Sequence, residues 1–398
     1  MAIDWTASMQ QTFEFYKVDP DTWSNTEKLD QVISAQVTWD DSNETLGSAS
    51  IETTEIMDEC YIRIYLICNQ NGVRYEFPIG TFMVQTPEES HNSGLVKVTM
   101  DAYTPLLELK DNVPPYGYTA MCGWNTLTTV SDLVSENCRA PVVRVSSNAS
   151  TYDSTETYMT GERAIYNGVE YECLSDILVA EEWNSEHWVQ IDKTIEVDTV
   201  SDFGNDSWLS FLTGLLATAE LKFGLDEMGR ILFRANQNDA AVRPIWTYDD
   251  GNSSILYPDV RVTRDLYGVP NVVEVLYSNE SGSVFSRVEN NDVDSPVSIP
   301  RRGRLVVYRE NNPDSLSNPS QEQLDNYAEN LLRDLSSLEY TISYTHGYCP
   351  VRVGDAVWIN YERAGLTDIK AVVISQQITC RPGCSVSETA KFTKKLWR

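Results

Sequence analysis

The sequence has few basic residues for its length. Its 398 residues include 30 Lys and Arg against 59 Asp and Glu, which gives a formal net charge of −29 with histidine neutral. The excess is N-terminal, because residues 299–398 hold 13 basic and 11 acidic side chains, which leaves −31 on the first 298 residues. Tight binding to nucleic acid needs cations that neutralise phosphates. The composition therefore argues against a sequence-specific nucleic-acid-binding protein.

Long apolar runs and an export signal are also missing. No stretch approaches the ~20 consecutive apolar residues that cross a bilayer. The first residues, MAIDWTASMQQTFEFY, lack the basic start and the apolar core of a secretory signal peptide. We expect a chain that is made in the cytoplasm.

Familiar catalytic motifs are absent as well. The sequence contains no HExxH, GxSxG, Walker or GxGxxG motif, which argues against the reaction classes that depend on them. With 59 acidic residues, close carboxylates are inevitable, so counting them gives no support to a glycosidase pair. We predict no catalytic residues, no cofactor and no enzymatic activity.

Cysteine and histidine are too dispersed to predict a metal site. Eight cysteines are spread along the chain beside three histidines, so reduced thiols are expected rather than a disulfide framework. The closest pair, Cys380 and Cys384 in CRPGC, is either half of a zinc site or a turn between two strands. Because no second close pair exists, the turn is favoured and no metal ligand is predicted.

His346 and Cys349 offer a base and a thiol three residues apart. On a strand, this spacing places two side chains on opposite faces, so a Cys–His nucleophile is not expected. We predict that the strand ends at Pro350 and that His346 is packed or lies at an interface.

Hydrophobic residues make up 41% of the chain, which is enough for packed cores. The first ~115 residues alternate apolar and polar positions in runs bounded by turn sequences such as DDSN and NQNG, which predicts antiparallel strands in a barrel or sandwich. Helices are predicted at 124–138 and from Trp208, the second followed by a strand, a turn at 226–229 and another strand. From about Pro258 the strand pattern returns, interrupted by one helix at 320–337 with an apolar stripe.

Residues 158–191 differ from their surroundings. A Ser- and Thr-rich stretch at 146–158 has the composition of a linker. The residues after it combine a short three-stranded pattern, an Asn167-Gly168 hairpin turn and several large aromatic side chains. A small separate module inserted into the mixed domain is predicted.

The predicted fold class is mainly β with an α+β middle. It comprises two β-barrel domains, a mixed α/β domain between them and a small β insert. The expected boundaries are 1–115 for the N-terminal barrel, 116–150 and 196–257 for the mixed domain, 151–195 for the insert, and 258–398 for the C-terminal barrel with its one helix.

Several stretches together resemble the tail-tip or baseplate hub proteins of long-tailed bacteriophages, also called tail-associated proteins. The likeness covers nearly the whole chain except the insert and is a succession of patterns: YEFPIGTFMVQTPEES at 75–90, LVKVTMDAYTPLLELK at 95–110, LKFGLDEMGRILFR at 221–234, PNVVEV at 270–275, LRDLSSLEYTISYTHGYCPVRVGDAVWINY at 332–361 and KFTKKLWR at 391–398.

This resemblance implies barrels of tail-tube type and a homotrimer whose six barrels form a ring. Such a ring closes the tail tube, adapts its six-fold symmetry to a three-fold tip and leaves a channel for viral genome ejection. The implied partners are a tail tube or distal tail protein and tip or receptor-binding proteins, in a virion assembled in the host cytoplasm. Acidic walls would let DNA pass without specific binding, although solubility alone also accounts for the charge.

The insert resembles small chitin-binding carbohydrate modules through its YNGxxY and WxxxxW spacing. The resemblance implies that Tyr166, Tyr171, Trp183 and Trp188 stack on sugar rings of a host cell-wall glycan. The sequence departs from such modules, because CLSD replaces the paired aromatics of the middle strand and the Pro-Gly before the last Trp is absent. The same four rings are also suited to be the core of a small module, so both interpretations stay open.

Basic residues concentrate in RRGR at 301–304 and in the C-terminal KFTKKLWR. They either contact an acidic surface of a neighbouring subunit or are ordinary solvated charges. Two other classes of function also stay open: a virion-borne or secreted carbohydrate-active enzyme, and a glycan-binding adhesin.

Overall fold

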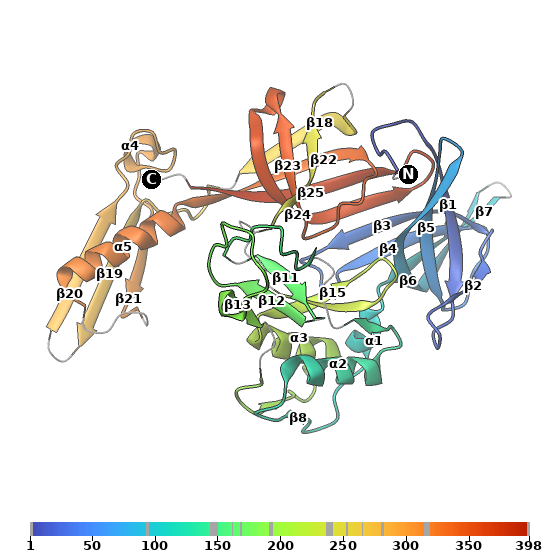
Figure 1. Ribbon diagram of the computed structural model, residues 1–398, viewed down its shortest axis with the longest axis horizontal. Helices are drawn as coiled ribbons and strands as arrows, with labels where there is room; N and C mark the ends of the chain where they lie inside the picture. The colour runs from blue at the N-terminus through green and yellow to red at the C-terminus, as the bar shows by residue number, and fades with distance from the viewer. Residues whose placement is uncertain are drawn as a thin grey trace. The chain divides into compact units, whose positions relative to one another are not determined.

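A computed structural model describes residues 3–92, 95–143, 150–160, 162–167, 169–190, 194–235, 242–251, 254–264, 266–279, 282–313 and 319–395 (Figure 1). The mainly β class with a mixed α/β portion is confirmed. Contacts group the chain into two compact units: the first is Met1–Asp259 with Tyr344–Glu388, and the second is Val260–Ser343 with Thr389–Arg398. The four domain boundaries drawn from the sequence stay a prediction.

The N-terminal strands form one antiparallel series in the order β3-β4-β7-β6-β5-β1-β2. Their bounds are β1 (Gln10–Val18), β2 (Asn25–Lys28), β3 (Val32–Asp40), β4 (Gly47–Thr53), β5 (Tyr61–Gln70), β6 (Val73–Asn92) and β7 (Leu95–Tyr103). Burial alternates residue by residue along β4, as the period-two pattern predicts. The predicted turn between β5 and β6 is confirmed: Gln70 pairs with Val73, and Asn71 and Gly72 both have positive φ.

Strands from the C-terminal part of the chain extend the same sheet. They are β17 (Pro244–Asp249), β18 (Leu256–Arg264), β22 (Ser337–Gly347), β23 (Ala356–Tyr361), β24 (Leu366–Cys380) and β25 (Ser385–Lys395), with the short helix η2 (Glu362–Ala364) after β23. The junction is an antiparallel pairing of β24 with β3, from Ser375 opposite Asp40 to Cys380 opposite Ala35. The result is a 13-stranded sheet, in which the pairings among described residues run from β18 to β2, and β23 and β17 branch from this order at β24.

The turn predicted at CRPGC is confirmed. β24 ends at Cys380 and β25 begins at Ser385, and the Cys384 amide donates to the carbonyl of Arg381 at 2.9 Å. Both cysteines are free and buried in the N-terminal core, which they share with Ile378 and Val386. The two thiols are therefore packing groups of a hairpin.

The mixed portion packs three helices beside a hairpin, and α1, α2 and α3 lie together on one side of β15 (Figure 1). Its elements are α1 (Leu106–Asp111), β8 (Thr119–Ala120), α2 (Thr126–Asn137), β9 (Val142–Val143), β14 (Thr199–Val200), α3 (Trp208–Thr218), β15 (Leu221–Leu225) and β16 (Ile231–Ala235). Both predicted helices and the strand–turn–strand unit are confirmed. Asn125 caps α2 and Ser207 caps α3, each accepting a backbone N–H with its side chain.

The turn between β15 and β16 fastens this portion to the N-terminal sheet. The carbonyl of Met228 accepts hydrogen bonds from Trp23 Nε1 at 2.7 Å and from Arg63 Nη2 at 3.0 Å. Arg63 is fully buried, and its Nε also donates to Thr81 Oγ1 at 2.9 Å. Gly229 completes the turn with φ of 72°, and a Cβ there would lie 2.7 Å from Thr81 Cβ. The close contact between the β15–β16 turn and the N-terminal sheet therefore requires glycine at position 229.

The insert is a four-stranded sheet in the order β10-β11-β12-β13. Its elements are β10 (Ser150–Thr151), β11 (Arg163–Tyr166), β12 (Val169–Cys173), η1 (Ser185–His187) and β13 (Trp188–Gln190). Tyr166 pairs with Val169, as expected for the predicted two-residue turn, although Gly168 itself lies outside the described residues. The fourth strand, β10, comes from the stretch interpreted as a linker, of which residues 146–149 are not described.

The second unit contains a separate three-stranded sheet in the order β20-β19-β21. Its elements are β19 (Val272–Asn279), β20 (Gly282–Glu289), α4 (Ile299–Arg302), β21 (Val307–Asn311) and α5 (Gln321–Leu335). The predicted helix is confirmed as α5, which begins with a capping box between Ser320 and Gln323. Its buried stripe of Leu324, Ala328 and Leu332 packs on β19. None of the described helices is both long and apolar enough to span a membrane.

Candidate functional site

The four aromatic side chains predicted to bind carbohydrate lie together around Trp183. Its ring stacks on Tyr166, with centroids 4.0 Å apart and planes at 5°, and lies 4.8 Å from Tyr171 and 5.3 Å from Trp188. Tyr152, which the sequence analysis did not single out, contacts Trp183 at 5.0 Å. The structure thus brings the four side chains and Tyr152 into one aromatic cluster.

The members of this aromatic cluster differ in exposure. Trp188 is only 4% exposed and its indole N–H is buried without a hydrogen-bond acceptor among the described residues. Tyr166, Tyr171 and Trp183 are half-buried and keep part of their surface in solvent. Glycan binding by these residues stays a prediction, and any stacking surface would have to come from the three half-buried rings.

Arg243 ties the insert to the residues that precede β17. Its guanidinium pairs with Glu162 at 2.7 Å, donates to the carbonyl of Thr157 and lies over the ring of Tyr158, 5.6 Å from the centroid. This group holds the chain at the start of β11 next to the start of β17. No local pattern predicts this group, because Arg243 and its partners are about 80 positions apart.

A fully buried polar cluster surrounds His346. Its Nε2 lies 3.2 Å from Glu388 Oε1 and 3.1 Å from the hydroxyl of Tyr248. Glu388 also accepts from Tyr344 Oη at 2.7 Å and from the amide of Gln376. The prediction that His346 is packed is confirmed, since its side chain has no exposed surface. All hydrogen-bonding capacity of the carboxylate is therefore used inside the protein.

The expectation that Cys349 and His346 point to opposite faces is wrong. β22 ends at Gly347, so Cys349 follows the strand, and its sulfur lies 4.0 Å from His346 Nδ1 and 3.2 Å from Tyr248 Oη. The cysteine is 2% exposed. A thiol that substrate cannot reach does not act as a nucleophile there.

The charge state of this cluster follows from its contacts. Burial alone would lower the pKa of His346, but the adjacent Glu388 carboxylate raises it to about 10. Burial would likewise raise the pKa of Glu388, yet the imidazolium and three hydrogen bonds hold that pKa below its ordinary value. Burial raises the pKa of Tyr344. At neutral pH the pair is an imidazolium and a carboxylate that share one enclosed site.

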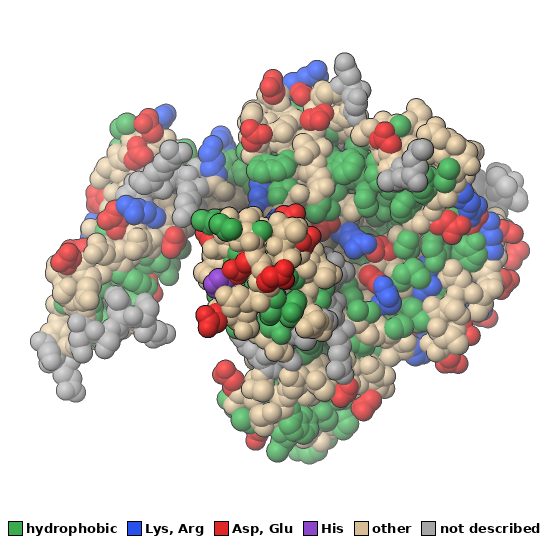
Figure 2. Space-filling model, viewed as in Figure 1, with side chains coloured by type: hydrophobic (Ala, Val, Ile, Leu, Met, Phe, Trp, Pro, Cys, Tyr) green, Lys and Arg blue, Asp and Glu red, His purple; other side chains and the backbone are tan. Residues whose placement is uncertain are grey.

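An apolar surface is exposed on the mixed portion. The segments 113–125 and 194–203 run side by side through the β8–β14 pairing. They expose a group of large apolar side chains: Val113, Tyr116, Met121, Trp124, Val197, Val200 and Phe203. Tyr116 and Phe203 are 84% and 75% exposed and contact each other at 5.3 Å. Figure 2 shows hydrophobic side chains gathered at the same place, at the lower edge of the view. We call this group the β8–β14 apolar surface.

Two arginines of the basic run at 301–304 donate to backbone carbonyls of the second unit, a role that neither interpretation from the sequence included. Arg302 donates to the carbonyls of Val269 at 2.6 Å and Leu266 at 2.8 Å, so it stabilises a loop of the second unit. Arg301 donates to the carbonyl of Val293 at 2.8 Å. Of the C-terminal run, residues 396–398 lie outside the described residues.

Within the part of the chain that the structure describes, no three His, Cys, Asp or Glu side chains are grouped so as to hold a metal ion. No protein-family model matches the sequence, and no curated protein matches it.

Solved structures do resemble the chain. The 43 kDa tail protein of prophage MuSo2 from Shewanella oneidensis matches with a TM-score of 0.56 at 10% identity, covering 96% of this chain and 98% of that one. The tail protein from Neisseria meningitidis MC58 matches with a TM-score of 0.53 at 10% identity, covering 97% and 98%. This chain has the fold of tail proteins. A chain of the half-lidded Francisella PdpA–VgrG complex also matches, with a TM-score of 0.50 at 10% identity, covering 96% of this chain and 58% of that one.

Proposed function

We propose that this chain is a non-enzymatic structural protein of a bacteriophage-type tail, placed in the virion at the tail tip as a homotrimeric hub. The observation that carries the proposal is the extent of the likeness to two tail proteins, which spans at least 96% of this chain and 98% of each of theirs. A fold shared along the full length favours a shared structural role, although fold alone does not determine function.

The β8–β14 apolar surface supports an assembly role. A contiguous group of exposed large apolar side chains on a soluble protein is typical of an interaction surface. In the proposed ring this surface would be covered by a neighbouring subunit, by a tail tube or distal tail protein, or by a tip or receptor-binding protein. The channel would pass DNA without binding it, since a net charge of −29 repels phosphate.

Contact with a host cell-wall glycan is a second part of the proposal. It is favoured by the half-buried stack of Tyr166 and Trp183, which leaves aromatic surface in solvent within a module that has its own small core. Microarray binding of the purified protein to chitin and peptidoglycan fragments tests this part. Binding without turnover supports an adhesive contact, and release of sugar fragments would contradict a non-enzymatic protein.

The hub proposal is tested by the assembly state. Light scattering should give about three times 45.0 kDa, and electron microscopy should show a ring with a central hole. We expect Phe203→Asp to weaken association with the ring or with tail partners, because it places a charge in the apolar surface. Tyr267→Asp, which changes an exposed aromatic residue of the second unit, is the matched control. A persistent monomer, alone and with tube or tip proteins, contradicts the proposal.

A further inference from the structure

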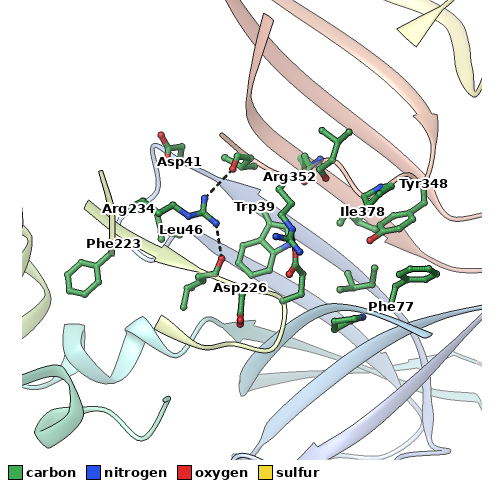
Figure 3. A pocket seen from close by; sticks show the side chains of 18 residues that line it. Trp39, Asp41, Leu46, Phe77, Phe223, Asp226, Arg234, Tyr348, Arg352 and Ile378 are labelled. Carbon is green, nitrogen blue, oxygen red and sulfur yellow. Dashed lines mark hydrogen bonds and ion pairs between the residues drawn. The ribbon is translucent and has the colours of Figure 1, made fainter. Parts of the chain in front are cut away.

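A cavity of about 130 Å³ lies inside the first unit, where three parts of the chain meet. Strands β3 and β6 contribute Trp39 and Ile79, the β15–β16 hairpin contributes Phe223 and Arg234, and the C-terminal strands contribute Ile378. In Figure 3 the indole of Trp39 lies in the middle of the view, and dashed lines join the guanidinium of Arg234 to two backbone oxygens. Apolar side chains therefore form most of the wall, as in ordinary small-molecule sites.

The acidic side chains that line the cavity all have cationic partners. Asp41 pairs with Lys222 at 2.6 Å, and Asp226 pairs with Arg230 at 2.6 Å. Glu227 pairs with Arg352, which also lines the cavity. The negative charges at this site are thus neutralised within the protein.

Arg234 is the exception among the charged lining residues. Its Nη1 and Nη2 donate only to the carbonyls of Val353 at 3.3 Å and Leu225 at 3.2 Å. Its Nε is buried without an acceptor among the described residues, and the carboxylates of Asp355, Glu227 and Asp41 attract the guanidinium without a hydrogen bond to it. Burial lowers the pKa of Arg234, but guanidinium stays protonated in proteins. The cavity therefore holds one cation that no carboxylate of the described residues contacts directly.

The position of this cation is fixed by the strand opposite. The Arg234 side chain lies across Gly224, where a Cβ would stand 2.6 Å from Nε and 2.8 Å from Cδ. The two backbone hydrogen bonds hold the far end of the guanidinium. A pre-positioned guanidinium loses little conformational entropy when it binds an anion, and its fork suits the two oxygens of a carboxylate.

We propose that this cavity binds a small carboxylate with an apolar body, with the carboxylate on Arg234 and the apolar body against Trp39 and Phe223. The apolar wall selects the body of the ligand, and the guanidinium, whose Nε has no acceptor among the described residues, selects its carboxylate. A buried N–H without an acceptor is costly, so a ligand carboxylate that accepts from it gains more there than at an exposed arginine. This proposal stands on the cavity alone and is independent of the assembly role.

The test compares two probes of equal shape by fluorine NMR on the full-length protein: 4-fluorobenzoate and its neutral analogue 4-fluorobenzamide. We expect the carboxylate to bind about tenfold or more tightly, because charge-assisted hydrogen bonds are about twice as strong as neutral ones. If the two probes bind equally, or if the carboxylate does not bind, the proposal is contradicted before any variant is made.

Two variants then locate the site. Arg234→Met should abolish the preference for the carboxylate, whereas Arg74→Met, which removes an exposed arginine of β6, should keep it. Should Arg234→Met fail to fold, Gly224→Ala displaces the guanidinium and keeps its charge, and it is expected to weaken carboxylate binding. An unchanged preference in the folded Arg234 or Gly224 variant contradicts the assignment.

Competition by an acidic peptide that carries an aromatic residue would identify a protein segment, rather than a free small molecule, as the source of the carboxylate.

Discussion

Replacing Glu388 with Gln tests whether the buried pair with His346 is charged. Gln keeps the size of the side chain and can still accept hydrogen bonds from Tyr344 and Tyr248, which donate to Glu388 Oε2 at 2.7 and 3.2 Å. It removes the negative charge that stabilises the imidazolium. Once that charge is absent, burial lowers the pKa of His346, and the histidine becomes neutral.

The pH dependence follows from the direction of each pKa shift. The pKa of His346 is raised from 6.5 to about 10, so its contribution to stability is complete below pH 6.5 and is lost as the pH rises toward 10. The pKa of Glu388 is lowered from 4.5, so its contribution is present above pH 4.5 and is lost in acid. The pair is therefore most stabilising between pH 4.5 and 6.5. A tenfold change in proton affinity equals about 1.4 kcal/mol, so the loss between pH 6.5 and 10 is at most about 5 kcal/mol.

Urea unfolding followed by tryptophan fluorescence measures this effect, because nine of the ten tryptophans lie in the first unit with the pair. At pH 6 we expect Glu388→Gln to lower the free energy of unfolding by about 3 to 5 kcal/mol, as for other broken buried pairs. The difference from wild type should shrink steadily toward pH 10.

The control for this series is Glu76→Gln, which removes an exposed carboxylate of the same unit, paired with Arg74. It should change stability by less than about 0.5 kcal/mol at every pH. A penalty for Glu388→Gln that stays constant from pH 6 to pH 10 would refute the reasoning, because it would mean that the wild-type pair carries no extra proton at neutral pH.

Three further substitutions test other features of the fold. Gly229→Ala should lower the free energy of unfolding by about 2 to 4 kcal/mol, because alanine is strained at positive φ and its methyl group meets Thr81; urea titration measures it. Trp183→Ala should unfold the insert if the ring is core, seen as lost near-ultraviolet circular dichroism, whereas a folded insert with lost glycan binding would indicate a stacking platform. Ser320→Ala should destabilise α5 by about 1 kcal/mol through loss of its N-cap, read as faster amide exchange in that helix, and unchanged exchange would contradict the capping role.

Features set by neighbouring residues were predictable from the sequence. The helices α2, α3 and α5 follow from apolar side chains at helical spacing beside a capping Asn125, Ser207 or Ser320. The hairpin at Asn71-Gly72 follows from the preference of both residues for positive φ. In each case the physical cause lies within a few positions of its effect.

Features that depend on distant partners were not predictable. Nothing in the sequence of β24 indicates that it pairs with β3, more than 330 positions earlier, and so joins the two ends of the chain in one sheet. The contact of His346 with Cys349 was missed for a different reason: the alternation rule holds only while the strand continues, and β22 ends at Gly347. The ion pairs around Arg234 likewise depend on three separate segments, which hold Asp41, residues 222–230 and Arg352.

The insert shows how far spacing alone can define a binding surface. The YNGxxY and WxxxxW patterns bring four rings together, but a module this small needs aromatic side chains for its core as much as for a ligand. The exposed fraction of each ring distinguishes a core side chain from one that can meet a ligand. Trp188 is enclosed and belongs to the core, and Trp183 is stacked on both Trp188 and Tyr166. A sugar would therefore meet the half-buried Tyr166 and Tyr171 first, so mutation of these tyrosines should affect glycan binding with less damage to the module than mutation of Trp188.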